Sequence, residues 1–294
     1  MQKTIAFIGL GTMGNPMAGH LQKAGHSLRL WARRPEVYET DLKPLIDGGA
    51  TGCASPKEAA SGADVVITMV TNTEDVSNVL LDGPDAAVGG MTEGTVCIDH
   101  STIDPAGARA IAARLKEKGI GFVDAPVSGG VWGAQDGTLA IMVGGDEKDT
   151  AIAVPIVETY AKAVTVIGGV GDGQVAKLCN QIAQVINIQG VAEALHFAKS
   201  NGADTAKVLT AISGGMGGSQ MMNLMGPKMV DRDFEAGIQA RLHAKDIFIV
   251  RDAAKKAGLN LPVVQQVASQ LQSLMDHDWG RNDSASLLRV LEEE

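Results

Sequence analysis

The chain has 294 residues, of which 45% are hydrophobic and 20% are charged, and its formal net charge is −9. These values are typical of a globular protein of one or two domains and exclude a disordered or fibrous chain. The negative charge and an aromatic content of only 3% argue against a protein that binds nucleic acid or an anionic membrane surface.

The N-terminal residues give no sign of a targeting segment. MQKTIAFIGLGTMG enters a strand-like segment directly, without the architecture of a cleavable signal peptide. No apolar run approaches the ~20 residues needed to cross a bilayer. Cys53, Cys97 and Cys179 are far apart and show neither CxxC nor metal-ligand spacing, so we interpret them as reduced, buried thiols. We therefore expect a cytoplasmic protein.

The first predicted strand, residues 4–9, runs into a glycine-rich turn and then a helical pattern. Gly9, Gly11 and Gly14 fit GxGxxG, and this context within a βαβ unit is typical of a dinucleotide-binding site. Gly9 permits the tight turn, Gly11 lets a pyrophosphate approach the backbone, and Gly14 lets the helix pack closely on the sheet. Because the helix start offers free N–H groups to phosphates, we also expect Thr12 and Met13 to contact the cofactor.

The second predicted strand, residues 27–32, indicates which dinucleotide binds. An NAD-selecting strand usually ends in Asp or Glu, which binds the ribose hydroxyls. Here Arg33 and Arg34 follow the strand, with no carboxylate before Glu36. Two guanidinium groups favour a 2′-phosphate, and hence NADP(H) over NAD(H), although one or both arginines facing solvent is the alternative.

Later strands bring further residues to the same edge of the sheet. One ends at Met69, Val70 and Thr71, and another is followed by Ser101 and Thr102. Because ligands of doubly wound sheets bind at the carboxyl ends of the strands, we expect these residues to contact the cofactor. The strands alternate with helical segments, which predicts a mostly parallel sheet. The remaining predicted strands are residues 65–70, 95–100, 121–125, 139–145 and 164–169.

After Gly171 the pattern becomes helical, in residues 174–200, 204–213, 240–257 and 262–276. The fold class predicted is α/β, with a doubly wound Rossmann sheet in residues 1–168, a long bridging helix and an all-α C-terminal domain, which together span residues 169–294. The bridging helix is apolar but carries Lys177 in its first turns. A buried ammonium is costly unless it is paired or acts on a ligand, and Asn180, Gln181 and Gln184 continue the polar stripe that it begins.

Four separated stretches resemble the β-hydroxyacid dehydrogenase family. They are FIGLGTMGNPMAGHL (7–21), DAPVSGG with GTLAIMVGG (124–145), GDGQVAKLCNQ (171–181) and LHAKD (242–246), and the resemblance extends over essentially the whole chain. The family includes 3-hydroxyisobutyrate dehydrogenase, tartronate semialdehyde reductase (2-hydroxy-3-oxopropionate reductase) and the glyoxylate/succinic semialdehyde reductases.

The resemblance implies a role for each matching residue. Lys177 matches the catalytic lysine and Asn180 its substrate-orienting partner. Lys245 matches a lysine near the nicotinamide end of the cofactor, whereas Asp246 is expected to be structural. Other positions match groups that bind substrate: Ser128, Gly129 and Gly130 match the residues that hold the carboxylate, and Thr102 lies at a position close to the nicotinamide.

These expectations together describe an enzyme. Hydride transfer to an aldehyde leaves an alkoxide, which a lysine ammonium stabilises and protonates; in the other direction the neutral amine accepts the proton. The best interpretation is an NADP(H)-dependent tartronate semialdehyde reductase that needs no metal. 3-Hydroxyisobutyrate dehydrogenase and glyoxylate/succinic semialdehyde reductase stay open, since Ile238 stands where a family member often has Phe. Imine reduction or a non-catalytic dinucleotide-binding module are more distant alternatives. We expect a homodimer or homotetramer.

Overall fold

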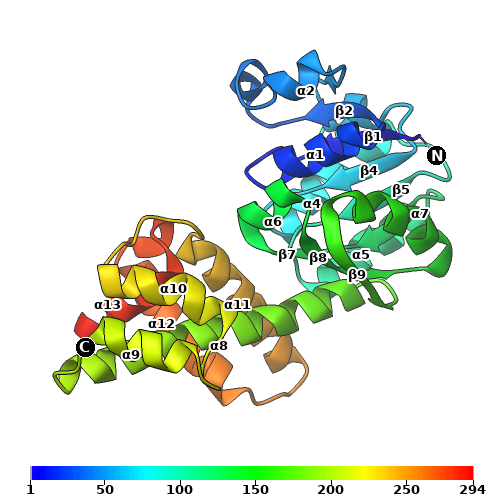
Figure 1. Ribbon diagram of the computed structural model, residues 1–294. Coiled ribbons are helices and arrows are strands. Elements are labelled where there is room, and N and C mark those ends of the chain that lie inside the picture. The colour runs from blue at the N-terminus through cyan, green and yellow to red at the C-terminus, as the bar shows by residue number, and fades with distance from the viewer. Residues whose placement is uncertain (1, 294) are drawn as a thin grey trace. The chain divides into compact units, whose positions relative to one another are not determined.

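The structure is a computed structural model that describes residues 2–293 (Figure 1). The chain divides into two compact units, Met1–Lys177 and Leu178–Glu294. The boundary falls within helix α8 (Asp172–Ser200), so this single element contributes residues to both units. The division expected after residue 168 lies slightly earlier, before the helix begins.

The first unit contains a nine-stranded sheet in the order β3-β2-β1-β4-β5-β6-β8-β7, with β9 paired to β8. The strands from β3 to β6 are parallel, β8 is antiparallel to β6 and β7, and β9 runs parallel to β8. The order 3-2-1-4-5-6 is that of a dinucleotide-binding doubly wound sheet. The strands are β1 (Thr4–Ile8), β2 (Ser27–Trp31), β3 (Thr51–Gly52), β4 (Val65–Thr68), β5 (Val96–Asp99), β6 (Gly121–Asp124), β7 (Val127–Ser128), β8 (Leu139–Gly145) and β9 (Ala161–Gly168).

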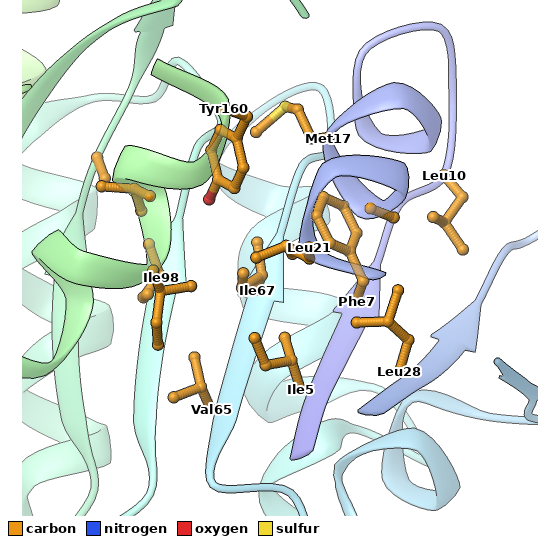
Figure 2. Packing of buried hydrophobic residues seen from close by; sticks show 14 of the residues in the cluster. Ile5, Phe7, Leu10, Met17, Leu21, Leu28, Val65, Ile67, Ile98 and Tyr160 are labelled. Carbon is orange, nitrogen blue, oxygen red and sulfur yellow. The ribbon is translucent and has the colours of Figure 1, made fainter. Parts of the chain in front are cut away.

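Helices cover both faces of this sheet, as the burial of β1 shows. Ile5 and Phe7 belong to one apolar cluster, whereas Ala6 and Ile8 belong to another on the opposite face. Because neighbouring side chains of a strand point to opposite faces, a strand buried on both sides reads as a continuous apolar run. Figure 2 shows the first cluster, where side chains of β1, β4 and β5 pack against Met17 and Leu21 of α1. The helices of this unit before α8 are α1 (Gly14–Lys23), α2 (Lys43–Asp47), α3 (Pro56–Ala60), α4 (Thr73–Ser77), α5 (Pro105–Lys116), α6 (Gly130–Asp136) and α7 (Glu147–Val157).

The second unit is helical, with a core of its own. Val185, Ile188 and Leu195 of α8 are buried in one cluster with side chains of α11 and α12, such as Ile247 and Leu271. Among the residues that the structure describes here, the only β pairing is an isolated bridge between Gln239 and Asp283. The remaining helices are α9 (Thr205–Ser213), α10 (Gln220–Asp231), α11 (Ala240–Lys256), α12 (Pro262–Asp276) and α13 (Leu287–Glu293).

The seven predicted strands and four predicted helices are all present, with small shifts at their ends. The structure adds the two-residue strands β3 and β7 and the helices α10 and α13, which the sequence did not predict. In α10, Pro227 lies inside the helix, where proline normally argues against a helical segment. Strands of two residues are too short to show a period.

One expectation about the cysteines is wrong. Cys53 and Cys97 are buried, but Cys179 is exposed in this chain. It lies on the face of α8 opposite the one that carries the buried Val185 and Ile188. All three are free thiols. Between residues 2 and 293 no helix is both long enough and apolar enough to cross a membrane.

Candidate active site

The glycine-rich turn connects β1 to α1, and its three glycines differ in what surrounds them. Gly9 has φ +99°, and a Cβ there would lie 2.3 Å from the carbonyl oxygen of Met69. A Cβ on Gly14 would lie 2.1 Å from the carbonyl oxygen of Gly9, so the helix packs against the turn too closely for a side chain. At Gly11, by contrast, nothing lies within 4 Å of where a Cβ would be, and the residue is exposed. A ligand can therefore approach the backbone at Gly11.

The start of α1 is arranged to receive an anion. Met13 at the N-cap makes no side-chain capping hydrogen bond, and the first turn contains no acidic residue. The first N–H groups of a helix have no partner within the helix and carry the positive end of its dipole. Because no carboxylate or hydroxyl of the cap occupies them, these residues fit the pyrophosphate of a dinucleotide.

The end of β2 presents two cations and no carboxylate. Ala32 stands at the strand end, where its N–H donates to the hydroxyl of Tyr38. Arg33 and Arg34 follow and are both exposed. Arg34, Gly11 and Thr12 are among the residues that line an open surface cavity of about 470 Å³. The guanidinium group of Arg34 is thus accessible to a ligand at the glycine-rich turn.

A buried polar network fixes the ends of β4 and β5. The N–H of Val70 donates to Ser101 Oγ (2.9 Å), and the N–H of Ser101 donates to Asp99 Oδ1 (3.1 Å). The hydroxyl of Thr68 donates to the same Asp99 oxygen (2.8 Å). Burial raises the pKa of Asp99 to about 6, against the lowering effect of these hydrogen bonds. The expected cofactor contacts Met69, Val70, Thr71 and Thr102 flank this network and are partly or fully exposed.

The start of α8 is tied to the ends of β5 and β6. Asp124, the last residue of β6, accepts the N–H of Gly171 (2.6 Å) and of Gln174 (2.8 Å). The side chain of Gln174 donates to the carbonyl oxygen of Ser101 (2.7 Å) and accepts the N–H of Ile103 (3.0 Å). Sequence reasoning did not identify Asp124 or Gln174, although both lie inside the two quoted motifs.

Lys177 belongs to this anchored helix start. It lies three residues after Gln174, so the two side chains share a helix face, and Lys177 is only 7% exposed. The anchored end of α8 therefore places a buried amine on the face of the helix that is tied to the carboxyl ends of β5 and β6.

The predicted substrate cradle is a strained turn between β7 and α6. Ser128 ends β7, and Gly129 (φ +140°) and Gly130 (φ +63°) follow with positive φ values. Other residues rarely adopt such values, so both glycines are required by the backbone. The turn leaves the amides without a β-carbon beside them, which suits a small anion.

The second unit, taken by itself, contains a chain of polar contacts that includes Asn180 and Lys245. The Asn180 amide donates to Gln181 Oε1 (3.0 Å), and the Gln181 amide donates to Asp246 Oδ2 (2.6 Å). The Lys245 ammonium lies 2.9 Å from Asp246 Oδ1. Asp246 thus has the structural role expected for it, because it joins α8 to α11 beside two of the predicted site residues. Gln181, which is 4% exposed, was placed on the polar stripe but given no role of its own.

Within residues 2–293, no three His, Cys, Asp or Glu side chains are grouped so as to hold a metal ion. The residues predicted for the site offer an amine, amides, hydroxyls and backbone N–H groups. Such a set can bind a carboxylate and exchange a proton with an oxygen atom of a substrate.

Comparison with known proteins identifies the family to which this arrangement belongs. Residues 4–168 match the NAD binding domain of 6-phosphogluconate dehydrogenase, and residues 171–291 match the NAD-binding domain of NADP-dependent 3-hydroxyisobutyrate dehydrogenase. The chain belongs to the 3-hydroxyisobutyrate dehydrogenase, or β-hydroxyacid dehydrogenase, family. It is an NAD(P)-dependent 3-hydroxyacid dehydrogenase acting on a CH–OH group, which removes the alternative of a non-catalytic module.

Three relatives show how the substrate varies within the family. The 2-hydroxy-3-oxopropionate reductase of Escherichia coli is 36% identical and covers 98% of this chain and 97% of its own. The NAD-dependent L-serine dehydrogenase of Pseudomonas aeruginosa is 35% identical, and the match covers 99% of this chain and 98% of that protein. A solved structure of Mycobacterium tuberculosis 3-hydroxyisobutyrate dehydrogenase with L-serine is 32% identical, with a TM-score of 0.87 and 99% coverage of both chains.

Proposed function

We propose that this β-hydroxyacid dehydrogenase is an NADP(H)-dependent reductase of a short carboxylated semialdehyde, with tartronate semialdehyde as the substrate. The observation that carries the proposal is the buried Lys177 at the anchored start of α8. The E. coli 2-hydroxy-3-oxopropionate reductase supports this choice of substrate, as do the stretches SGGMGGSQ (213–220) and MVDRDF (229–234), which resemble that branch of the family.

The proposed division of labour follows from what each group can do. The bound nicotinamide supplies the hydride in the reductive direction. Ser128 and the amides of Gly129 and Gly130 hold the substrate carboxylate, and Asn180 orients the substrate oxygen. Lys177 donates its proton to the oxygen that becomes the hydroxyl, and its neutral amine takes that proton back in the oxidative direction. Thr102 and Lys245 lie toward the nicotinamide end in this proposal.

NADP(H) is the proposed cofactor because of the end of β2. A 2′-phosphate gains charge-assisted hydrogen bonds from an exposed guanidinium, and the chain has no carboxylate between the end of β2 and Arg34. We expect Arg33→Ala and Arg34→Ala to raise the KM for NADPH by about tenfold or more each, with the KM for NADH changed less than about twofold. Steady-state kinetics with both cofactors checks this. An unchanged NADPH KM in both variants contradicts the role of the arginine pair.

Oxidation of 3-hydroxyisobutyrate or L-serine is the second candidate. Both compounds carry a carboxylate and a hydroxymethyl group, as does the reduction product of tartronate semialdehyde. Two observations favour it: Ile238 stands where a family member often has Phe, and two of the relatives above are named for these compounds or bound to one. One methyl or hydroxyl group in a pocket changes discrimination by only about 10–200-fold.

The experiment is an absorbance assay at the nicotinamide band. NADPH and NADH are each tested with tartronate semialdehyde and methylmalonate semialdehyde, and NADP+ and NAD+ with L-serine and 3-hydroxyisobutyrate. NADPH-dependent reduction of tartronate semialdehyde with the highest kcat/KM is the expected result. A higher kcat/KM for methylmalonate semialdehyde or L-serine moves the protein to the second candidate, and a preference for NADH contradicts the cofactor assignment.

We further propose a homodimer or homotetramer in the cytoplasm. Val175 and Phe197 are apolar side chains of α8 that are 43% and 71% exposed in the single chain, and a second copy would cover such residues. Free cysteines at three positions suit a reducing compartment. Light scattering on the purified protein measures the assembly, and a monomer at micromolar concentration contradicts it.

A further inference from the structure

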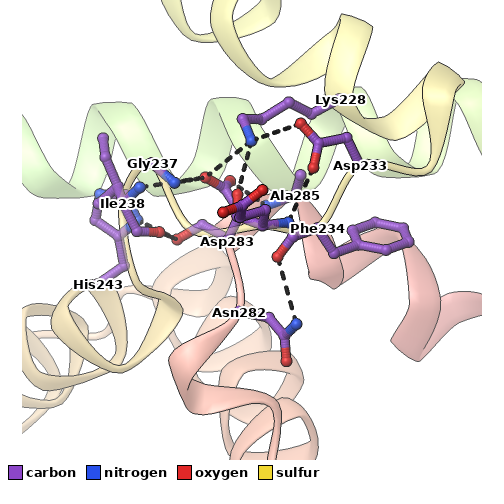
Figure 3. A network of polar contacts seen from close by, with 11 residues as sticks. Lys228, Asp233, Phe234, Gly237, Ile238, His243, Asn282, Asp283 and Ala285 are labelled. Atoms are coloured by element: carbon purple, nitrogen blue, oxygen red, sulfur yellow. Dashed lines mark hydrogen bonds and ion pairs between the residues drawn. The ribbon is translucent and has the colours of Figure 1, made fainter.

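Two short connecting segments of the second unit are joined along their length by hydrogen bonds. The first, residues 234–240, leads into α11; the second, residues 282–286, precedes α13. Asp283 donates its N–H to the carbonyl oxygen of Phe234 (3.0 Å), and Ser284 donates to that of Ile238 (3.2 Å). Ala240, the first residue of α11, donates to Asn282 (2.9 Å). We call these two joined segments the clasp (Figure 3).

A buried carboxylate lies at the centre of the clasp. Asp283 is fully buried, and its Oδ2 accepts the N–H of Gly237 (2.9 Å) and of Ile238 (3.2 Å). Its Oδ1 accepts the N–H of Ala285 (3.0 Å), and the Lys228 ammonium lies 3.7 Å from Oδ2. A buried charge is tolerated only when it is paired and hydrogen-bonded, and Asp283 meets both conditions through groups of two other segments.

The clasp controls the beginning of α11. Gln239, the N-cap of this helix, makes no side-chain capping hydrogen bond. The clasp replaces the cap, because Asp283 holds the two residues before Gln239 and Asn282 holds Ala240. One turn further, His243 Nδ1 lies 2.7 Å from Ser284 Oγ, which is also 3.4 Å from the carbonyl oxygen of Ile238.

The same helix carries Lys245 two residues later. His243 and Asp246 are three residues apart and share a face of α11, and both are held by buried partners, Ser284 and Gln181. Two anchors one turn apart fix both the rotation of a helix about its axis and its position along it. Lys245 lies between them, so its direction follows from the two anchors.

We propose that Asp283 is a positioning residue, which acts through the clasp to orient Lys245. The functional part of this statement rests on the proposed function, in which Lys245 lies toward the nicotinamide end of the cofactor. The structural part does not, because it concerns only how tightly α11 is held at its start.

The first test measures Lys245 directly and needs no activity. Purified variants are treated with an amine-reactive succinimidyl ester, and the labelling rate of each lysine is followed by mass spectrometry. Lys245 is 22% exposed and paired with Asp246, whereas Lys255 and Lys256 at the far end of α11 serve as references. In Asp283→Asn we expect Lys245 to be labelled at least fivefold faster, with both references within about 1.5-fold. Asparagine replaces one of the two carboxylate oxygens by an NH2 group, which cannot accept the N–H groups that this oxygen accepts in the wild type.

Asp233→Asn is the matched control. Asp233 binds the same Lys228 ammonium (3.1 Å) and accepts the N–H of Glu235 (3.0 Å), but its side chain is 53% exposed, and Glu235 lies at the end of the clasp away from α11. We expect its Lys245 labelling rate to equal that of the wild type. Should Asp283→Asn not fold, Ser284→Ala tests the same clasp more mildly, since it removes only the hydroxyl that contacts His243 and the carbonyl oxygen of Ile238. Unchanged Lys245 labelling in a folded clasp variant overturns the proposal.

The second test is a double-mutant cycle in NADPH-dependent turnover. We expect Asp283→Asn to lower kcat/KM by 10-fold or more in the wild-type background but by less than twofold in a Lys245→Ala background. A merely structural residue lowers kcat/KM by the same factor in both backgrounds, and that result overturns the proposal. If the wild type reduces none of the semialdehydes, the proposed function fails, while the labelling test still decides whether Asp283 orients Lys245.

Discussion

Lys177 occupies a buried position on a helix that carries few other charges. Lys177 is only 7% exposed. By contrast, the side chain of Lys199, near the other end of α8, is 62% exposed and pairs with Glu292 at the surface. Lysine side chains usually extend to solvent, because the ammonium group loses hydration when it is buried. The cost of burying Lys177 is therefore offset by polar partners or by a ligand.

Lys177→Ala tests whether this amine exchanges the proton. We expect kcat to fall by a factor on the order of 10² or more, since general acid–base catalysis contributes about 10²–10⁴-fold. NADPH binding, measured by fluorescence titration, should change less than about threefold, because the lysine acts on the substrate oxygen. Lys199→Ala is the control and should keep kcat within about twofold. Near-normal turnover of Lys177→Ala contradicts the role proposed for it.

At the scale of single residues, the sequence predicted structural roles that depend on a short motif, but not those that depend on a partner far along the chain. The roles of Gly9 and Gly14 followed from a short motif, because the turn and the close helix packing involve neighbouring chain segments. Asp124 was quoted within a motif, but its function depends on a hydrogen bond to Gly171, which is 47 residues away. No periodicity or spacing identifies such a pair in a single sequence.

Among the elements, α8 is anchored at its start by a residue of another element. The N–H groups of Gly171, just before the helix, and of Gln174, in its first turn, both donate to Asp124 at the end of β6. A carboxylate at a helix start both accepts hydrogen bonds and interacts favourably with the helix dipole. The glycines around it leave no room for another arrangement, since a Cβ on Gly173 would lie 2.8 Å from Asp124 Oδ2.

Asp124→Asn should therefore destabilise the first unit. We expect the free energy of unfolding to fall by about 2–4 kcal/mol, because the amide NH2 faces a buried N–H that the carboxylate oxygen accepted. Urea unfolding at pH 8 measures this, where the wild-type carboxyl is ionised although burial raises its pKa to about 6. Asp172→Asn is the matched control: Asp172 lies in the same helix turn but is exposed and pairs with Arg109. Its loss should cost about 1 kcal/mol or less. Equal losses in the two variants would contradict the anchoring role.

The elements themselves were predictable where their sequence period is strong. The parallel strands, the long α8, and α11 and α12 follow from alternating or helical apolar patterns. The helix α10 was missed because Pro227 and the glycine-rich residues before it argue against a helix, whereas tertiary packing of Met222, Met225 and Met229 stabilises it. The clasp around Asp283 was missed for another reason: apart from the short 3₁₀ turn Ser284–Ser286, its segments have no regular structure and therefore no sequence period.

Across the whole molecule, two buried groups respond to pH in opposite directions. Burial raises the pKa of Asp99 to about 6, from an ordinary value near 3.8, and lowers the pKa of His100 to about 4, from about 6.5. Asp99 is the last residue of β5, and His100 follows it; both are buried. His100 Nε2 lies 2.8 Å from the hydroxyl of Tyr160. The folded state thus keeps both groups uncharged over the pH range between 4 and 6.

The sign of each effect follows from proton binding in the two states. Between pH 4 and 6 the folded state keeps a proton on Asp99 that the unfolded chain has lost, so this carboxyl lowers the free energy of unfolding as pH rises through that window. His100 behaves oppositely. Below about pH 6.5 its imidazole is protonated in the unfolded chain, whereas in the folded state it stays neutral down to about pH 4. Its contribution is therefore lost as pH falls.

Substitution of each group should reveal these opposite slopes. Asp99→Asn keeps an acceptor for Thr68 and Ser101, and its stability relative to the wild type should rise by roughly 3 kcal/mol between pH 4 and pH 7, at 1.36 kcal/mol per pKa unit. His100→Gln should become more stable relative to the wild type as pH falls over the same range, whatever its absolute stability. Urea unfolding at pH 4.5, 5.5 and 7 measures both differences. Parallel slopes for the two variants would contradict opposite pKa shifts, because a loss of packing alone changes stability equally at every pH.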